Sequence, residues 1–79
     1  MDEIIIRNID ELNKALEDGY TNFYTKGLLN HSFHITFGDK EGIYEVNDLA
    51  DDVIILMNAE EILEEFENNF NNGTFIAED

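Results

Sequence analysis

The chain has 79 residues, of which 19 are Asp or Glu and only 4 are Lys or Arg, so its formal net charge is −15. A surface this acidic is repelled by nucleic acid and by anionic membranes, and we expect its partners to be basic protein surfaces. The absence of cysteine excludes disulfides, thiolate chemistry and zinc–sulfur sites.

Length and hydrophobic content predict one small folded domain over residues 1–79. Hydrophobic residues make up 43% of the chain, which favours folding although the net charge alone would favour disorder. A chain of this size has no room for a second domain or a large active-site cleft. The first three residues are acidic where a secretory signal is basic, and no apolar run approaches about 18 residues. We therefore expect a cytoplasmic protein.

The N-terminal part of the chain predicts a short strand followed by a helix. Residues 4–6 are three consecutive isoleucines, typical of a brief strand or of a hydrophobic staple. Asn8 with Glu11 resembles a capping box, and apolar residues then recur at helical spacing. Gly19 is a natural left-handed terminator, so the first helix is predicted over residues 9–18.

The middle of the chain predicts an antiparallel meander. Residues 20–26 are rich in Thr, Tyr and Phe, and residues 32–37 alternate strictly between apolar and polar. A glycine-containing turn at 38–42 leads into a third strand at 43–47. The fold class expected is thus α+β, with an N-terminal helix, a three- to four-stranded meander and a C-terminal helix packed on the sheet.

The apolar run at residues 53–57 leaves two interpretations open: a buried fourth strand or the beginning of a helix. A strand is favoured, because Asn58 followed by Glu61 predicts a new helix start at that point. Residues 74–76 predict a further short strand.

Residues 58–71 predict an amphipathic helix with one apolar and one acidic face. The apolar stripe comprises Ala59, Ile62, Leu63, Phe66 and Phe70. The remaining faces carry Glu60, Glu61, Glu64, Glu65 and Glu67. These carboxylates span roughly 12 Å of helix axis, about one charge per 2 to 3 Å, which is the same order as the one per ~1.7 Å of duplex DNA.

This acidic face has a plain interpretation and a functional one. Glutamate runs on exposed helices are often only solvated faces. Ordinary solvated faces mix signs, however, because like charges at i,i+4, such as Glu60 with Glu64 and Glu61 with Glu65, repel each other. We favour a functional, one-signed surface. From Glu41 to the end of the sequence no Lys or Arg interrupts the acids.

The sequence contains no recognisable catalytic or metal site, and we expect neither an enzyme nor a cofactor. His31 and His34 are three residues apart, which on a strand places them on opposite faces. Asp48, Asp51 and Asp52 resemble a calcium loop only in charge, since the ligand spacing of an EF-hand is missing. No nucleophile elbow or phosphate loop is present, and the chain has a single serine.

Aromatic residues of the meander have two interpretations, stacking on nucleic-acid bases or packing in the core. The scarcity of basic residues around them favours the core, with one or two tyrosines left for a protein interface. They are Tyr20, Phe23, Tyr24, Phe33, Phe37 and Tyr44.

Residues 10–19, which read DELNKALEDG and precede an aromatic strand, are similar to small proteins carried by phages and integrative elements of low-GC Gram-positive bacteria. The layout of helix, meander and acidic helix resembles that of DNA-mimic anti-CRISPR proteins that inhibit the type II-A nuclease Cas9. The best-known protein of that layout carries a further helix after the second one, whereas this chain has only residues 74–79 there.

The resemblance implies an anti-defence inhibitor that acts in the host bacterial cytoplasm, as a monomer or homodimer. It would occupy the basic DNA- or PAM-binding site of its target, with carboxylates in the place of phosphates. The residues expected to contact the partner are Asp39, Glu41, Glu45, Asp48, Asp51, Asp52, Glu60, Glu61, Glu64, Glu65 and Glu67. Two alternatives remain open: an immunity protein that neutralises a basic nuclease toxin, and a small acidic adaptor or regulator of a transcription or recombination enzyme.

Overall fold

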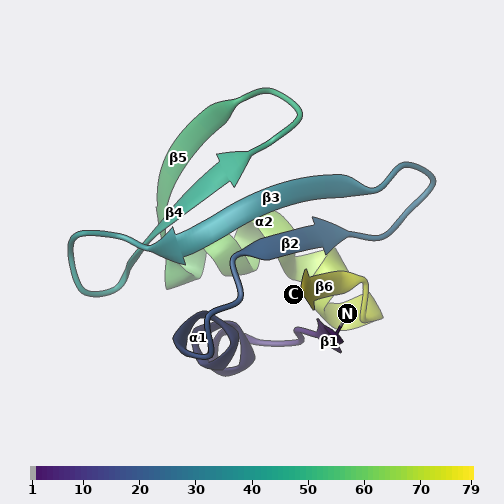
Figure 1. The fold of residues 1–79 in the computed structure, drawn as a ribbon, viewed down its shortest axis with the longest axis horizontal. Helices are drawn as coiled ribbons and strands as arrows, with labels where there is room; N and C mark the ends of the chain where they lie inside the picture. Colours follow the sequence, from purple (N-terminus) through teal and green to yellow (C-terminus); the bar gives the residue numbers. More distant parts are fainter. Residues whose placement is uncertain (1) are drawn as a thin grey trace.

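In a computed structural model that describes residues 2–79, two helices pack on a six-stranded antiparallel sheet (Figure 1). In chain order the elements are β1 (Glu3–Ile5), α1 (Ile9–Glu17), β2 (Asn22–Thr25), β3 (His31–Phe37), β4 (Ile43–Asp48), β5 (Val53–Asn58), α2 (Ala59–Asn72) and β6 (Phe75–Glu78). The strands lie in the order β1-β6-β2-β3-β4-β5. The predicted α+β class is confirmed.

Both helices begin at an asparagine cap, as predicted. The Asn8 side chain accepts the Glu11 backbone N–H at 2.8 Å, but the Glu11 carboxylate accepts the Arg7 N–H instead of closing the box. At α2 the capping box is complete: Asn58 accepts the Glu61 N–H at 2.8 Å, and Glu61 accepts the Asn58 N–H at 2.9 Å. These bonds satisfy backbone donors that have no partner inside a helix.

The sheet is larger than the predicted three- to four-stranded meander. Strands β2 to β5 form that meander, and the two chain ends add β1 and β6. Strand β6 lies between β1 and β2, with Ala77 opposite both Ile4 and Phe23. The predicted short last strand is therefore confirmed, and it is paired on both sides.

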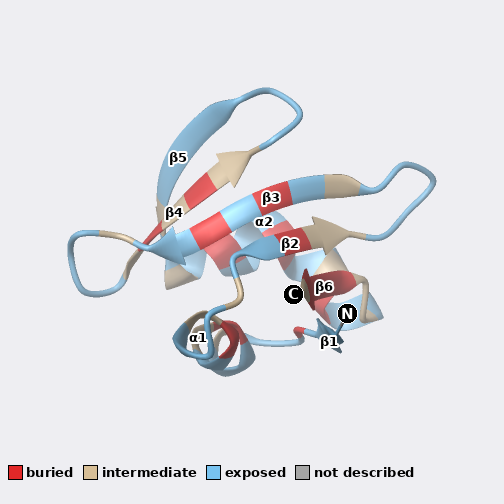
Figure 2. Ribbon diagram, in the orientation of Figure 1, coloured by how far each residue is buried: buried red, intermediate tan, exposed pale blue. Residues whose placement is uncertain are grey.

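One face of the sheet carries the core and both helices, and Figure 2 shows buried residues alternating with exposed ones along β3. The other face is exposed or partly exposed along β2 to β5, whereas Ile76 of β6, on that face, is buried. The core includes Leu12 and Ala15 of α1, Ile62, Phe66 and Phe70 of α2, and Phe23, Phe33, Ile35, Tyr44, Val46, Phe75 and Ala77 of the sheet. On β3 the alternation predicted from sequence is confirmed for Phe33 and Ile35, which are buried between exposed Ser32, His34 and Thr36. Both helices thus lie on one side of the sheet.

Three expectations about burial are wrong. Residues 53–57 do form a strand, but Val53 to Leu56 are exposed because β5 is the outermost strand. Leu63, at the margin of the apolar stripe, is 43% exposed, and α2 is kinked three residues later, at Phe66. Phe37, at the end of β3, is also half-exposed. Of the other meander aromatics, Tyr20 and Tyr24 are partly buried.

Candidate functional site

The most concentrated charge of the molecule lies on the outward face of α2. Its five glutamates, Glu60, Glu61, Glu64, Glu65 and Glu67, are all exposed. The ion pairs found among residues 2–79 are Lys14 with Asp18 and His31 with Asp48, so none involves α2. Within the described residues, none of the five glutamates is therefore paired with a basic side chain.

The α2 glutamates are held in place by the core beneath them. Ile62, Phe66 and Phe70 are buried and fix the helix on the sheet. Glu61 also closes the capping box, so one of its oxygens is engaged by the Asn58 N–H. The backbone of Phe66 leaves the helical region at φ −112° and ψ 16°, so Glu67 lies beyond a bend in the helix.

A second acidic group lies on the β3–β4 turn, close to where α2 begins. Strand register pairs Ile43 with Asn58, the cap of α2, which brings this turn to the same end of the sheet. Asp39 and Glu41 are exposed on the turn, and Glu45 follows on the open face of β4. Asp39 and Glu45 border a common hollow with Lys40, so a positive charge interrupts this group.

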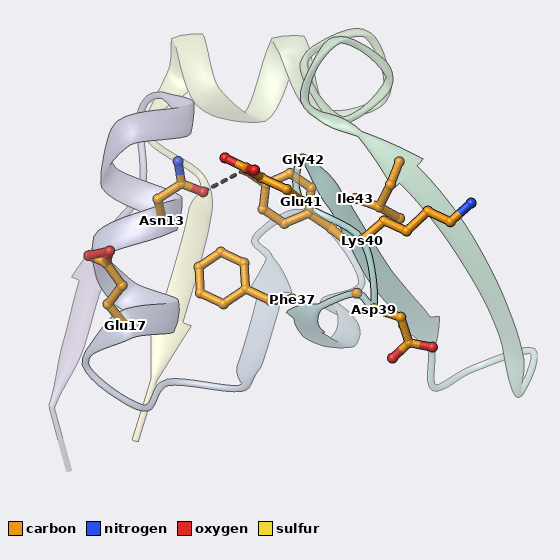
Figure 3. A pocket seen from close by; sticks show the side chains of 10 residues that line it. Asn13, Glu17, Phe37, Asp39, Lys40, Glu41, Gly42 and Ile43 are labelled. Carbon is orange, nitrogen blue, oxygen red and sulfur yellow. Dashed lines mark hydrogen bonds between the residues drawn. The ribbon is translucent and has the colours of Figure 1, made fainter.

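A hollow of about 490 Å³ separates α1 from the β3–β4 turn (Figure 3). Glu17 of α1 and Glu41 of the turn both line it. The Tyr44 hydroxyl donates a hydrogen bond to the Asn13 side chain, which joins β4 to α1. Burial raises the pKa of Tyr44, and the bond to Asn13 acts in the opposite direction. The phenol therefore stays neutral and serves as a structural link.

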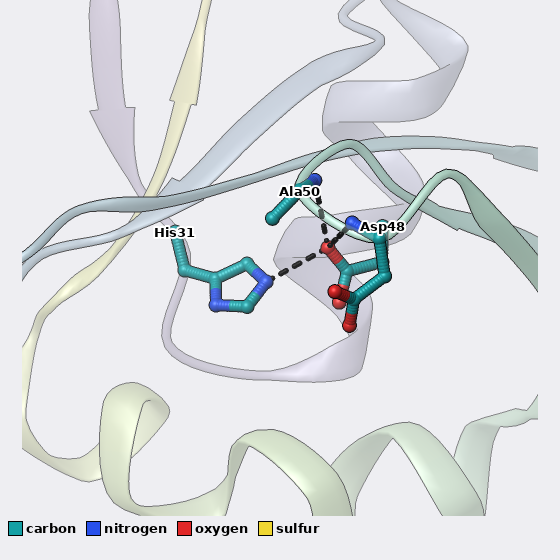
Figure 4. Close-up of polar contacts among 4 residues, drawn as sticks. His31, Asp48 and Ala50 are labelled. Carbon is teal, nitrogen blue, oxygen red and sulfur yellow. Dashed lines mark hydrogen bonds and ion pairs between the residues drawn. The ribbon is translucent and has the colours of Figure 1, made fainter.

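The Asp48 carboxylate is hydrogen-bonded to groups of its own chain, so it is less available to a partner (Figure 4). Its carboxylate lies 2.8 Å from His31 Nε2 and accepts the backbone N–H groups of Ala50 at 3.0 Å and Asp51 at 3.4 Å. The hydrogen bond from His31 lowers the pKa of Asp48, and partial burial opposes that effect. Asp51 and Asp52 are left exposed on the turn that this cluster organises.

The two histidines lie on opposite faces of β3, as predicted. His31 stacks on Phe33, with 4.8 Å between ring centroids, and pairs with Asp48 on the helix-covered side. His34 is exposed on the open side. Within residues 2–79, no group of three or more potential ligands is placed to hold a metal ion, and no helix has the length and apolar character needed to cross a bilayer.

The predicted contact residues therefore form two separate regions. The glutamates at the start of α2 and the β3–β4 turn share one end of the sheet, while Asp51 and Asp52 lie at the other end of β4. Because β4 has six residues, the two ends are about 17 Å apart. A partner that covers α2 and the nearer turn does not need to reach Asp51 and Asp52.

Two exposed apolar features were not anticipated as surface. One is the edge strand β5, and the other is the tip of the β2–β3 connection, where Leu28 and Leu29 are 105% and 89% exposed. In the sequence, β5 is marked by an apolar run without polar alternation, and the tip of the β2–β3 connection is marked by a pair of leucines. Both signals are equally consistent with burial.

Comparisons with protein-family models, with curated proteins and with solved structures found no match to this chain. The resemblance to anti-CRISPR proteins thus remains a prediction that rests on layout and acidity.

Proposed function

We propose that the chain is a DNA-mimic inhibitor of phage or mobile-element origin. It would occupy the basic DNA- or PAM-binding site of a host nucleic-acid-binding defence enzyme, with Cas9 as the first candidate target. The observation that best supports this proposal is the outward face of α2, where five exposed glutamates have no ion-pair partner among residues 2–79.

The spacing and rigidity of these charges suit phosphate mimicry. A carboxylate, like a phosphate, accepts paired hydrogen bonds from an arginine guanidinium. Ile62, Phe66 and Phe70 anchor the helix in the core, so the charges reach a partner already ordered and little conformational entropy is lost on binding. Asp39 and Glu41, near the start of α2, extend the acidic surface toward the sheet.

The helix gives up local stability to keep this one-signed face. Glu60 with Glu64 and Glu61 with Glu65 are like-charge pairs one turn apart, each of which destabilises a helix slightly. Lysines at some of these positions would have provided a solvated face with favourable pairs. When the glutamates contact a basic binding site on the partner, the repulsion between them is removed. Binding therefore restores the stability that the helix gives up in the free chain.

The proposal is tested by competition for DNA. Guide-loaded Cas9 is mixed with labelled PAM-containing duplex, and the chain is added before or after the DNA at low and high salt. We expect DNA binding to be lost when the chain is added first, and the inhibition to weaken steeply as salt rises. Absence of inhibition at both salt concentrations contradicts Cas9 as the target.

Two charge-matched variants separate the α2 face from net charge. The α2 variant carries Glu60→Gln, Glu61→Gln, Glu64→Gln and Glu65→Gln. The control variant neutralises four exposed acids elsewhere, through Asp2→Asn, Asp10→Asn, Glu17→Gln and Asp79→Asn. Glutamine at residue 61 still closes a capping box, so the α2 variant is expected to fold. Inhibition should be lost in the α2 variant and retained in the control.

A further inference from the structure

Strand β5 is an exposed, uncharged edge in a strongly acidic molecule. It is the last strand of the sheet as described for residues 2–79, and Figure 2 shows most of it exposed. Ile54 and Leu56 are 60% and 62% exposed, on the open face of the sheet, and Val53 and Ile55 are each 46% exposed on the other. All four are apolar, although the chain carries a net charge of −15.

Sheet edges of monomeric proteins are normally protected. Common protections are a very short strand, a charged side chain or a proline. The opposite edge, β1, has only three residues, whereas β5 has six and contains neither a charge nor a proline. Strand β5 therefore has the properties of an edge that another strand covers.

The strand register shows which backbone groups of β5 are free. Gly38 donates to Ile43 and Leu49 donates to Ser32, so odd-numbered residues of β4 direct their backbone groups toward β3. Even-numbered residues of β4 then bond to β5, where their partners are Val53, Ile55 and Met57. Ile54 and Leu56 consequently turn their N–H and C=O groups to the free edge.

We propose that β5 pairs antiparallel with β5 of a second copy, about a two-fold axis at Ile55. In this register Ile54 lies opposite Leu56 of the second copy, and each such pair exchanges two N–H···O=C bonds. Val53 lies opposite Met57 of the second copy, and Ile55 lies opposite its own equivalent. The sheets become continuous, and both α2 helices remain on the same side. The dimer goes beyond the proposed function and does not depend on it.

A second copy fits this edge better than a strand from a basic partner. Every side chain from Val53 to Met57 meets an apolar side chain of the second copy, whereas a basic strand would find no acid along β5. Asp51 and Asp52 fall just outside the paired segment. Because pairing consumes β5 on both copies and leaves only the short β1 edges, the assembly closes at two.

The size of the surface indicates a weak, reversible dimer. The exposed apolar area of β5 is on the order of 400 Å² per copy, comparable to the largest apolar patches of monomeric proteins. Even complete burial of two such patches would remove only about 800 Å² in total, below the roughly 1,200 Å² typical of stable complexes. We therefore expect the dimer to form at tens to hundreds of micromolar, and to be strengthened by salt, which screens the repulsion between two acidic copies.

The register is tested by cross-linking in a chain that has no cysteine of its own. In the proposed dimer the two residue-55 positions form a non-hydrogen-bonded pair with Cα atoms about 4.5 Å apart, within the range of a disulfide. Ile55→Cys should give a disulfide-linked dimer under mild oxidation. Leu29→Cys, at a position that is 89% exposed, should give much less. Equal yields for the two variants would overturn the proposed register.

Sedimentation equilibrium tests the dimer without any cross-link. The unmodified chain should show a monomer–dimer equilibrium, whereas Leu56→Pro and Ile54→Lys should stay monomeric. Proline at position 56 removes an outward N–H that the fold itself does not use, a placement that edge strands tolerate. Leu29→Lys, which makes the same charge change as Ile54→Lys, should leave the dimer intact. Far-UV circular dichroism verifies the fold of each variant.

The dimer would be overturned by a monomer at millimolar concentration, by assemblies larger than two, or by a dimer that Leu56→Pro and Ile54→Lys both leave unchanged. A dimer that weakens as salt rises would also contradict the inference. This salt response is opposite to the one expected for binding of the chain to Cas9, so failure of one proposal is distinguishable from failure of the other.

Discussion

Replacement of Phe66 by leucine should destabilise the fold strongly, because this ring joins α2 to the sheet. Its centroid lies 5.2 Å from Phe33, 4.9 Å from Phe75 and 6.4 Å from Phe70. The side chain is 4% exposed and stands at the kink of α2. The ring therefore determines which face of α2 is buried and which face displays the glutamates.

The expected loss follows from these contacts. Buried aromatic pairs contribute about 0.5–1.5 kcal/mol each beyond the area that they bury, and leucine keeps much of the apolar area but none of the ring geometry. We expect Phe66→Leu to lower the free energy of unfolding by about 2 kcal/mol, from a total of about 4–12 kcal/mol for a domain of this length. Since 1 kcal/mol corresponds to about 4–8 °C in such domains, Tm should fall by about 8–16 °C.

The assay is thermal unfolding followed by circular dichroism, with Phe37→Leu as the matched control. Phe37 is 49% exposed, and among the described residues its ring is paired only with Tyr44, at 6.0 Å. The control should therefore change stability by less than about 0.5 kcal/mol. Equal losses in the two variants would refute the placement of Phe66 at the junction of helix and sheet, and with it the orientation of the acidic face.

Three further changes test the caps, the charges and the turn. Gly73→Ala should lower the urea midpoint by an amount that corresponds to about 1–2 kcal/mol, because residue 73 ends α2 at φ 69° and an added Cβ would meet the Arg7 guanidinium at 2.9 Å. Added NaCl should raise the Tm of the unmodified chain by screening like charges, and the rise should be smaller in the α2 variant. The lowered pKa of Asp48 means that its stabilising effect is complete above its ordinary value near 3.8 and is lost as pH falls through the lowered folded value. Asp48→Asn should accordingly weaken the decline of the urea midpoint between pH 4 and pH 2, whereas an unchanged decline would contradict a stabilising His31 contact.

Local features of the fold were predictable because local chemistry determines them. Asn8 and Asn58 cap their helices through a side-chain oxygen that bonds a backbone N–H three residues later, a pattern visible in the sequence. The alternation around Phe33 likewise reported which face of β3 is buried. These signals depend on neighbours within a few residues.

Non-local features were not predictable in the same way. Strands β1 and β6 have three and four residues and pair across nearly the whole chain, as Ile4 does with Ala77. The exposure of β5 also depends on its place at the edge of the sheet, since an apolar run has the same composition in a central strand. Nothing in the run from Val53 to Met57 distinguishes the two positions.

The candidate site also combines a local feature that the sequence predicts with a non-local feature that it does not. The exposure of the α2 glutamates follows from helical periodicity alone, and the structure places all five on the surface. The engagement of Asp48 by His31 required the pairing of β3 with β4, which sets Phe33 opposite Asp48 and brings His31 near it. The 17-residue separation of this pair left no local signal in the sequence.

The most direct test of the proposed function compares the inhibition of Cas9–DNA binding by the unmodified chain, the α2 variant and the control variant across a range of salt concentrations. The proposal predicts that the unmodified chain and the control inhibit with similar strength and similar steep salt dependence, while the α2 variant fails to inhibit. Equal inhibition by the α2 variant would contradict phosphate mimicry by this helix and direct attention to the open sheet face and the Leu28–Leu29 tip.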